Sequence, residues 1–370
     1  MDRKELLGLI ALQHIPGVGS ITAKRLVEGV GSAAQIFEHR IELPTIIPNI
    51  QPSLVKALDC PTAHHRAEQE LEFIDKHHIT CLGYHDENYP SRLRECDDAP
   101  ILLFYRGNAQ LNPRRVVSIV GTRKCSDYGR DLCEGLVRDL AAQCPDVLIV
   151  SGLAYGIDVC AHRAAIKYGL PTVGVLAHGL DRIYPSVHRN TAAQMVDGGG
   201  LLTEYISHTE PERTNFLQRN RIVAGMADAT IIVESAVKGG SLVTANIANS
   251  YGRDCFTFPG RITDSSSAGC HRLIRHNQAA LITSADDLIE AMMWDTSQKV
   301  QTVQQNLFPE FNEEESYIVQ ILEKYTEGAT INTLVIETGL PVHRLSATLF
   351  ELEMRDIVRP LAGSIYKLKR

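Results

Sequence analysis

One short turn combines a strand end, a glycine and two cations. The stretch VVSIVGTRKCSDYGRD, residues 116–131, begins as an apolar run and breaks on glycine. The residues that could contact a ligand there are Gly121, Thr122, Arg123, Lys124 and Ser126. A strand that ends on glycine and leads into a helix often binds a phosphate, because the helix amides point at the ligand. A dinucleotide fingerprint needs three spaced glycines, and only Gly121 and Gly129 occur here.

Similar turns follow other apolar runs farther along the chain. Gly152 and Gly156 lie in SGLAYGIDVCAHRAA, where they would let the backbone approach a ligand closely. RNRIVAG opens a predicted helix, and ESAVKGGSLVTAN places a Lys-Gly-Gly-Ser turn at a helix start, which is a ready anion site. The residues concerned are Arg219, Asn220, Arg221, Lys238, Gly239, Gly240 and Ser241. Together these turns predict a broad positive groove for a polyanion.

The elements that must position these turns form an alternating pattern. Nearly continuous apolar runs occur at 116–121, 147–152, 171–176, 199–204, 229–234 and 254–260, separated by helical text. Strand–helix alternation of this kind predicts a parallel sheet covered by helices on both faces. Ligands of such sheets bind at the carboxyl ends of the strands, which is where the polar turns fall.

The flanking segments have a different character. Residues 1–80 are predicted to form short helices. Within them IPGVGSITAKRLVEGVG resembles a helix-hairpin-helix, whose turn amides can bind a DNA phosphate. The same stretch could instead be a glycine-capped corner of a small helical bundle. Residues 81–115 are expected to be a connector before the core at 116–294. A glutamine-rich, acidic linker at 295–315 leads to 316–370, where three helices and two short strands follow the order of a winged helix.

Bulk composition narrows the class of protein. The chain has 370 residues and a net charge of −7, which argues mildly against a nucleic-acid binder, although the distribution of charge matters more. Nine scattered cysteines without CxxC or zinc spacing fit reduced thiols in the cytosol. No apolar run is long enough to cross a membrane, and the N-terminus has no signal-peptide pattern, so a cytoplasmic protein is expected.

Over residues 118–282 the sequence resembles the DNA-processing protein A (DprA, or Smf) family. IVGTRKCSDYG, VSGLAYGIDVCAHRAA, VGVLAHGLDRIYP, RNRIVAG, VESAVKGGSLVTANIAN, GRDCFTFPG and LIRHN follow one another in the family's order. His188, Leu217-Gln218, Arg261 and Asn277-Gln278 depart from the family pattern, and none of these departures removes a cation.

The resemblance implies a Rossmann-like α/β core with an N-terminal helical domain, SAM-like or helix-hairpin-helix, and a C-terminal winged helix. It implies a cytosolic protein of natural transformation that binds and protects incoming single-stranded DNA, loads the RecA recombinase, and works as a homodimer. No catalytic activity, cofactor, metal or membrane is expected. By position it assigns DNA binding to Arg123, Arg219, Asn220, Arg221, Lys238, Gly240, Ser241 and Thr244. The aromatic residues near the strand ends are Tyr128, Tyr155, Tyr184 and Phe216. Such rings more often pack in the protein than stack on a base, and Phe216, just before Arg219, is the first to test as a base platform.

Two other readings stay open at this point. One is a nucleotide-binding phosphoribohydrolase, which would need a catalytic carboxylate near position 246. The residue there is Asn246, and an asparagine amide cannot act as a general base. Asp158 and His162 are four residues apart on one helix face and could form an acid–base pair, or serve as structural anchors. A winged-helix regulator with a Rossmann-like sensor would need base-reading side chains on the helix PVHRLSATLFELE, which carries mainly His343 and Arg344.

Overall fold

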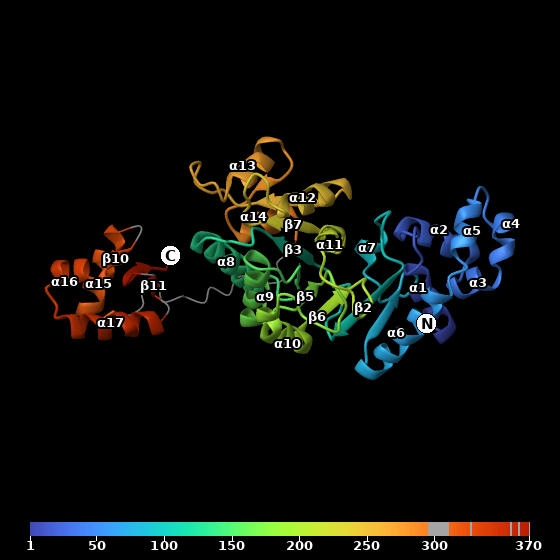
Figure 1. Ribbon diagram of the computed structural model, residues 1–370. Coiled ribbons are helices and arrows are strands. Elements are labelled where there is room, and N and C mark those ends of the chain that lie inside the picture. The colour runs from blue at the N-terminus through green and yellow to red at the C-terminus, as the bar shows by residue number, and fades with distance from the viewer. Residues whose placement is uncertain (295–310, 326–327, 356, 362, 370) are drawn as a thin grey trace. The chain divides into compact units, whose positions relative to one another are not determined.

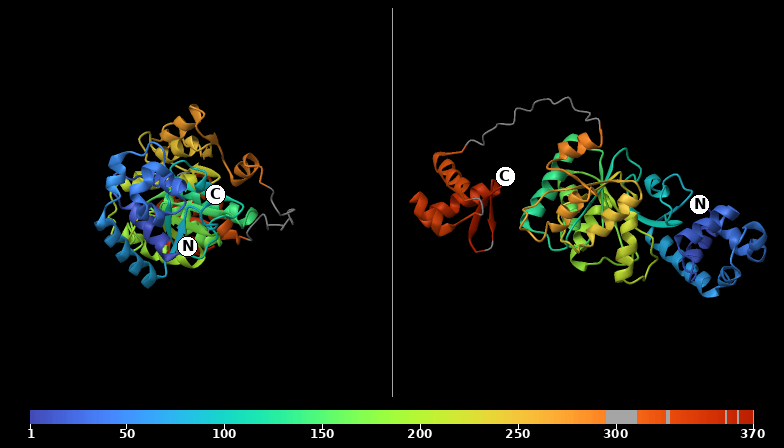
Figure 2. Two further views of the ribbon diagram at one scale, coloured as in Figure 1. Left: turned by 90° about the vertical axis from the view of Figure 1, so that its right-hand side faces the viewer. Right: turned by 90° about the horizontal axis from the view of Figure 1, so that it is seen from above.

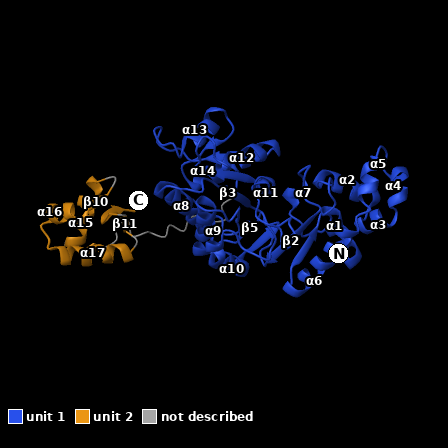
Figure 3. Ribbon diagram, viewed as in Figure 1, with its two compact units in different colours: residues 1–298 blue, residues 299–370 orange. Residues whose placement is uncertain are grey.

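The computed structural model describes residues 1–294, 311–325, 328–355, 357–361 and 363–369. It contains two compact units, residues 1–298 and residues 299–370, shown in different colours in Figure 3. No helix among the described residues is long and apolar enough to cross a membrane.

The larger unit is built on a nine-stranded sheet in the order β1-β2-β6-β5-β4-β3-β7-β8-β9. From β6 to β9 all neighbouring strands are parallel, whereas β1 and β2 pair antiparallel at one edge. The strands are β1 (Thr80–Gly83), β2 (Leu102–Gly107), β3 (Val116–Val120), β4 (Leu148–Ser151), β5 (Thr172–Val175), β6 (Gly200–Thr203), β7 (Ala229–Ile232), β8 (Asp254–Thr257) and β9 (Ala280–Leu281). The six predicted runs are confirmed as β3 to β8.

Helices cover both faces of the sheet, as the apolar runs predict (Figure 1). Successive side chains of β3 alternate between two buried clusters, with Val117 and Ile119 beside α8 and α9 and Val116 and Val120 beside α11 and α12. The helices are α8 (Asp127–Gln143), α9 (Ile157–Tyr168), α10 (Arg189–Gly198), α11 (Arg213–Gly225), α12 (Ser241–Ser250), α13 (Ala268–Arg275) and α14 (Ala285–Ala291), with a 3-10 turn η2 (Ser186–His188). The expected α/β class is confirmed.

The segment expected to be a connector, 81–115, is part of the sheet instead. It supplies most of β1, the short helix α7 (Ser91–Arg94) and β2, and β2 pairs with β6 in antiparallel register from Phe104↔Thr203 to Gly107↔Gly200. The apolar run at 101–105 is fully buried, as a strand with helices on both faces requires. The prediction missed it because its flanks are rich in charged and turn-forming residues.

The N-terminal helices pack against this antiparallel edge (Figures 1 and 2). Their core continues into Leu102 and Phe104 of β2. Buried Glu70 accepts from the amide of Ser207, at 2.9 Å, in the loop after β6. The elements are α1 (Arg3–Gln13), α2 (Ser20–Val30), α3 (Ala33–Glu38), η1 (Arg40–Glu42), α4 (Leu43–Ile46), α5 (Pro52–Ala57) and α6 (Pro61–His77). The helical character predicted for residues 1–80 therefore holds up to His77.

The smaller unit has the element order of a winged helix. Its three helices share one apolar core with a three-stranded antiparallel sheet, β10-β12-β11. The elements are α15 (Glu313–Lys324), β10 (Ala329–Thr330), α16 (Ile331–Thr338), α17 (Val342–Met354), β11 (Val358–Leu361) and β12 (Ile365–Leu368). Asn312 and Glu315 form a capping box at the start of α15, so the last residues of the expected linker are helical. Residues 295–310 of that linker lie outside the described residues.

Candidate functional site

The predicted turns meet at one edge of the sheet. Strands β5, β4, β3 and β7 are adjacent and parallel, so the loops after Val175, Ser151, Val120 and Ile232 all emerge on the same side. Parallel strands gather functional loops in this way because their carboxyl ends share an edge. The sequence-predicted residues are therefore brought together, but the structure gives them different roles.

The loop after β3 is held in place by a buried carboxylate, Glu234. The Glu234 side chain is only 2% exposed and accepts hydrogen bonds from Ser126 N and Ser126 Oγ, both at 2.8 Å. Its carbonyl oxygen accepts from Thr122 N at 2.7 Å. Ser126 also caps α8 through Gly129 N, at 3.0 Å. Ser126 was predicted to contact a ligand, but its hydroxyl is engaged within the protein, so we assign it a positioning role.

Glu234 was missed by the sequence analysis. It ends the apolar run ATIIVE, and a lone acid at the end of a buried strand was the available signal. A buried carboxylate must find charged or hydrogen-bonding partners, and those partners here belong to the loop that the site depends on. The residue therefore belongs to the candidate site even though it does not face solvent.

Two glycines allow neighbouring segments to approach this loop. Gly156 has a φ of +77°, and a Cβ there would lie 2.1 Å from Thr122 O and 2.8 Å from Arg123 Cα. Gly121, after β3, would place a Cβ 2.5 Å from the side chain of Ile157. The loop that carries Arg123 therefore lies directly on the start of α9, and a larger side chain at either glycine would push the two apart.

The Arg219 side chain is buried in the protein and supports the loops at the carboxyl ends of the strands. Its side chain is 3% exposed, and Nη1 donates to Val175 O at 2.5 Å. A Cβ on Gly152 would lie 2.0 Å from the same Nη1, so that glycine makes room for the guanidinium. Burial lowers the pKa of Arg219, and the nearby carboxylate of Asp158 opposes that fall. We therefore assign Arg219 a supporting role, and its direct phosphate contact stays a prediction.

Arg221 is also occupied within the protein. It forms an ion pair with Glu204 and donates to Asp98 O, and its Nη2 donates to Ser20 Oγ at 3.2 Å. These contacts join α11 to the start of α2 and to the loop before β2. We therefore assign Arg221 a structural role, and its phosphate contact stays a prediction. Asn220, between the two arginines, is half-buried.

Arg123 is an exposed cation at this edge of the sheet, and its guanidinium lies against an aromatic ring. Its guanidinium carbon is 5.2 Å from the centroid of Phe216 on α11. Phe216 in turn packs on Tyr184, with centroids 5.8 Å apart, and Tyr184 is 46% exposed. Lys124 follows Arg123 and is exposed. A cation and two rings at the same surface can bind a phosphate and stack against the base attached to it.

In the Lys-Gly-Gly-Ser turn the lysine is exposed and the serine hydroxyl is buried. Lys238 is exposed at the turn before α12. Ser241 donates to Ser235 Oγ at 2.8 Å and is buried, as is Thr244 one turn later. We therefore assign both residues packing roles, and their ligand contacts stay predictions. Gly239 lies against Ser235, where a Cβ would come within 2.2 Å of its Oγ. Gly240, the N-cap of α12, remains exposed beside Lys238.

The acid–base pair considered for an enzyme lies inside the protein. His162 is fully buried, and its Nδ1 lies 2.7 Å from Thr172 Oγ1. Burial, with Arg219 and His188 nearby, lowers the pKa of His162 to about 3. Burial raises the pKa of Asp158, and the charge of Arg219 opposes that rise. His162 is fully buried and Asp158 is nearly so, and Asp158 accepts from Ala154 N at 3.4 Å just before α9, so both side chains are engaged inside the protein.

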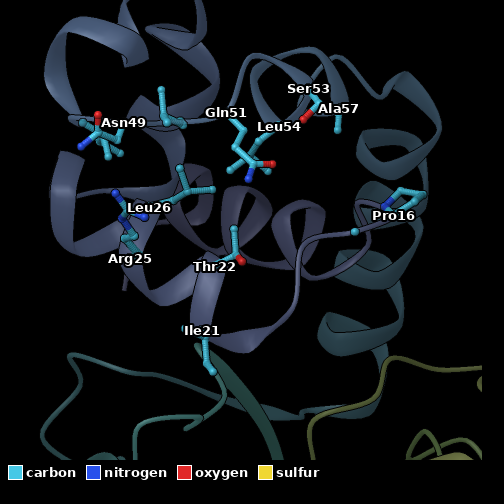
Figure 4. A pocket seen from close by; sticks show the side chains of 13 residues that line it. Pro16, Ile21, Thr22, Arg25, Leu26, Asn49, Gln51, Ser53, Leu54 and Ala57 are labelled. Carbon is cyan, nitrogen blue, oxygen red and sulfur yellow. The ribbon is translucent and has the colours of Figure 1, made fainter.

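A cavity of about 450 Å³ lies away from this edge, among the N-terminal helices (Figure 4). Pro16 and Gly17, from the turn between α1 and α2, line it together with Arg25 and Asn49. Arg25 Nη2 donates to Pro48 O at 2.9 Å across its rim. The turn therefore borders a hollow of mixed polarity, and its DNA contact stays a prediction. Among the described residues no group of three or more His, Cys, Asp or Glu could hold a metal ion.

Known proteins resemble the chain in both units. The family described as DNA recombination-mediator protein A matches residues 80–293, and the DprA winged helix domain matches residues 312–364. The chain is 31% identical over 306 residues to protein Smf of Escherichia coli, covering 82% of this chain and 81% of that protein. It is 39% identical over 238 residues to a putative DNA processing protein DprA of Mycobacterium tuberculosis, covering 61% of this chain but only 60% of that protein's length.

Two solved structures share the fold. The X-ray structure of DprA from Streptococcus pneumoniae aligns with a TM-score of 0.58 and 32% identity, covering 74% of this chain and 98% of that one. DNA processing protein A from Helicobacter pylori, whose structure is described as giving insights into a unique single-stranded DNA binding mode, aligns with a TM-score of 0.53 and 30% identity. That alignment covers 58% of this chain and 95% of the Helicobacter chain.

Proposed function

The chain belongs to the DNA recombination-mediator protein A family, and from that premise we propose that it binds single-stranded DNA at the carboxyl edge of its parallel sheet. The surface concerned consists of Arg123, Lys124, Tyr184, Phe216 and Lys238, which we call the strand-end surface. All three cations in it are exposed and come from two different loops. The single-stranded DNA binding described for the Helicobacter pylori relative supports the choice of ligand.

The contact between Arg123 and Phe216 carries this proposal. The exposed Arg123 guanidinium lies over the Phe216 ring. The guanidinium can bind a phosphate and the ring can stack on a base, and binding of single strands uses both kinds of contact. Glu234 holds the loop of Arg123 in place without leaving a free negative charge at the surface. Neither feature selects a particular base, so binding depends on backbone charge and stacking and has little sequence specificity.

Other parts of the role follow from the family. We propose that the protein protects single-stranded DNA, loads the RecA recombinase onto it, acts as a homodimer in the cytosol, and catalyses no reaction. RecA loading is tested with DNA precoated by a single-strand-binding protein, where the full chain should speed RecA filament formation. An unchanged rate of filament formation, with DNA binding intact, would contradict the loading role alone.

The DNA-binding proposal is tested by replacing Arg123. Arg123→Ala should weaken the affinity for a fluorescent single-stranded oligonucleotide more than any other single change on the surface. Loss of one charge-assisted phosphate contact costs about 1.5–3 kcal/mol.

Arg138→Ala is the matched control for that titration, because Arg138 is exposed on α8, pairs with its neighbour Asp139 and carries the same charge. Equal affinities for Arg123→Ala, Arg138→Ala and the unaltered chain, with all three folded, would contradict the proposal.

A further inference from the structure

Helix α17 of the smaller unit has apolar side chains on two opposite faces (Figure 1). The first face is buried in the core of that unit, through Leu345, Leu349 and Leu352. The second face is exposed to solvent, and on it Phe350 is 61% and Met354 72% exposed. A helix at the surface of a globular domain normally has a single apolar stripe, so the second stripe indicates a further contact.

The exposed stripe has the spacing of a coiled-coil seam. Its members follow one another at intervals of four, three and four residues, which places them in one line along the helix. Arg344 and Glu351 lie seven residues apart on one flank of this line, and all six residues are exposed. The set, which we call the α17 seam, consists of His343, Ala347, Phe350 and Met354 with the flanking Arg344 and Glu351.

The α17 seam is poorly suited to reading DNA. A helix that reads base edges in the major groove directs side chains such as Arg, Asn or Gln at the bases. The middle of the seam carries Ala347 and Phe350 instead, and the carboxylate of Glu351 beside them would repel phosphates. Arg344 forms an ion pair with Glu314 of α15, which partly neutralises the cation of the seam. These features favour a protein as the partner.

We propose that the α17 seam binds the same seam of a second copy of the chain, with the two helices antiparallel. Around a twofold axis, the same flank of each antiparallel helix meets, in opposite order along the helix. An axis midway between Arg344 and Glu351 therefore places Arg344 of each copy opposite Glu351 of the other. The same register seats the ring of Phe350 between His343 and Ala347 of the second helix, where the small alanine leaves room for it.

The charges also select the direction of the second helix. In a parallel coiled coil, the flank that carries Glu351 would meet the opposite flank of the partner helix. That flank carries Ser346 and Glu353, so Glu351 would find no cation there and one like charge. The antiparallel pair instead makes two attractions of opposite charge, and the seam is complementary to itself only in that direction.

The contact is small and is weak on its own. The 13 residues of α17 span about 20 Å, so the pair buries less than the roughly 1,200–2,000 Å² of a stable interface. It therefore forms mainly between chains that are already close together, such as chains bound to one DNA strand. That consequence rests on the proposed function, whereas the contact itself does not require DNA.

Cross-linking of the full chain at high concentration, followed by peptide mapping, tests the pairing. In Ala347→Cys the two new thiols lie beside the twofold axis, only about 1.5 Å apart along the helices, and a short bismaleimide should join them. In Met354→Cys the new thiols are about 20 Å apart along the helices, so no 354–354 link should form. Equal yields of the two links would show a parallel pair and contradict the proposal.

Charge reversal tests the contact between Arg344 and Glu351. Arg344→Glu and Glu351→Arg, each combined with Ala347→Cys, should each give at least about fivefold less 347–347 link, because like charges then face one another. An equal mixture of the two variants should restore the yield, since opposite charges meet again in the mixed pair. A mixture that links no better than either variant alone would overturn the assigned register.

The remaining outcomes separate this proposal from the others. Absence of the 347–347 link overturns it, even if sedimentation shows a dimer, because another surface would then hold the copies together. A link from residue 347 to residues 1–294 within one chain would assign the seam to the larger unit. Loss of the link on adding duplex DNA would assign it to DNA, and either result overturns the proposal. Titration of the same samples with a single-stranded oligonucleotide tests the proposed function independently.

Discussion

At the scale of single residues, burial decides what each arginine of the edge does. Arg123 is exposed, whereas Arg219 is almost completely buried and Arg221 is held by Glu204. All three were predicted to contact DNA, although α11 begins at Arg213, so Arg219 and Arg221 lie within this helix and not at its start. Arg219 is held by the carbonyl of Val175 in β5, and Arg221 is held by Glu204 and Asp98, whereas Arg123 projects from the loop after β3.

Glu234 offers a test of that supporting layer. Glu234→Gln keeps the shape of the side chain but removes the charge that accepts from Ser126 N and Oγ. We expect the free energy of unfolding to fall by about 1–3 kcal/mol, because hydrogen bonds to a buried charge are lost or weakened. Single-stranded DNA affinity should fall less than in Arg123→Ala.

Denaturant unfolding and a DNA titration together check this prediction. Glu290→Gln, which removes an exposed carboxylate from α14, is the control. If Glu234→Gln unfolds at the same denaturant concentration as the unaltered chain, Glu234 does not hold the loop.

His162 predicts a loss of stability in acid. Its pKa falls from 6.5 to about 3 on folding, mainly through burial, so the unfolded chain binds a proton that the folded chain excludes. The stability from a neutral, buried His162 is therefore complete above the unfolded pKa and is lost as pH falls from about 6.5 toward 3.

The comparison variant is His162→Asn, which does not titrate and can still reach Thr172. Its unfolding free energy should depend less on pH between 7 and 4 than that of the unaltered chain, as measured by denaturant unfolding at several pH values. Parallel curves for the two proteins would show that His162 does not contribute this dependence.

At the scale of elements, the antiparallel edge decides which fragment can fold. Residues 80–107 supply β1 and β2, and Phe104 of β2 is buried beneath the N-terminal helices. A fragment of residues 116–290 would expose the edge of β6, whereas residues 1–298 form a complete compact unit. We therefore predict that residues 1–298 fold and bind single-stranded DNA without the winged helix.

Circular dichroism and DNA titration of the two fragments test this division. The shorter fragment should aggregate or unfold at lower denaturant, because an unpaired strand edge and an uncovered apolar face destabilise it. An affinity of residues 1–298 that is more than about tenfold below that of the full chain, or 1.4 kcal/mol, would place the winged helix in the DNA site.

The sequence predicted the parallel core more fully than its edge or its site. Runs such as residues 116–121 and 229–234 are apolar throughout, and only a strand buried on both faces needs that pattern. Strand β2 escaped notice because its short apolar run lies between segments rich in charged and turn-forming residues, which read as a connector. Ser126 and Ser241 lie in loops at this edge, but whether a hydroxyl in a turn faces solvent depends on packing that the sequence does not show.

At the scale of the whole molecule, the proposed DNA surface is positive on a chain of net charge −7. Salt screens surface charges beyond about 8–10 Å, so distant acids weaken local phosphate contacts only slightly. Three exposed cations remain at the strand-end surface once Arg219 and Arg221 are assigned to the interior. Duplex DNA is stiffer than a single strand and fits separate loops less well, so it should bind more weakly.

The sharpest test of the proposed DNA site is the salt dependence of the affinity for a single-stranded oligonucleotide of about eight nucleotides. Each phosphate contact to a single strand contributes about 0.7 to the slope of log affinity against log salt, so three exposed cations predict a slope near −2. Arg123→Ala should reduce the steepness by about 0.7, and Arg138→Ala should leave it unchanged. A flat response to salt, or a slope that Arg123→Ala does not alter, would contradict the account.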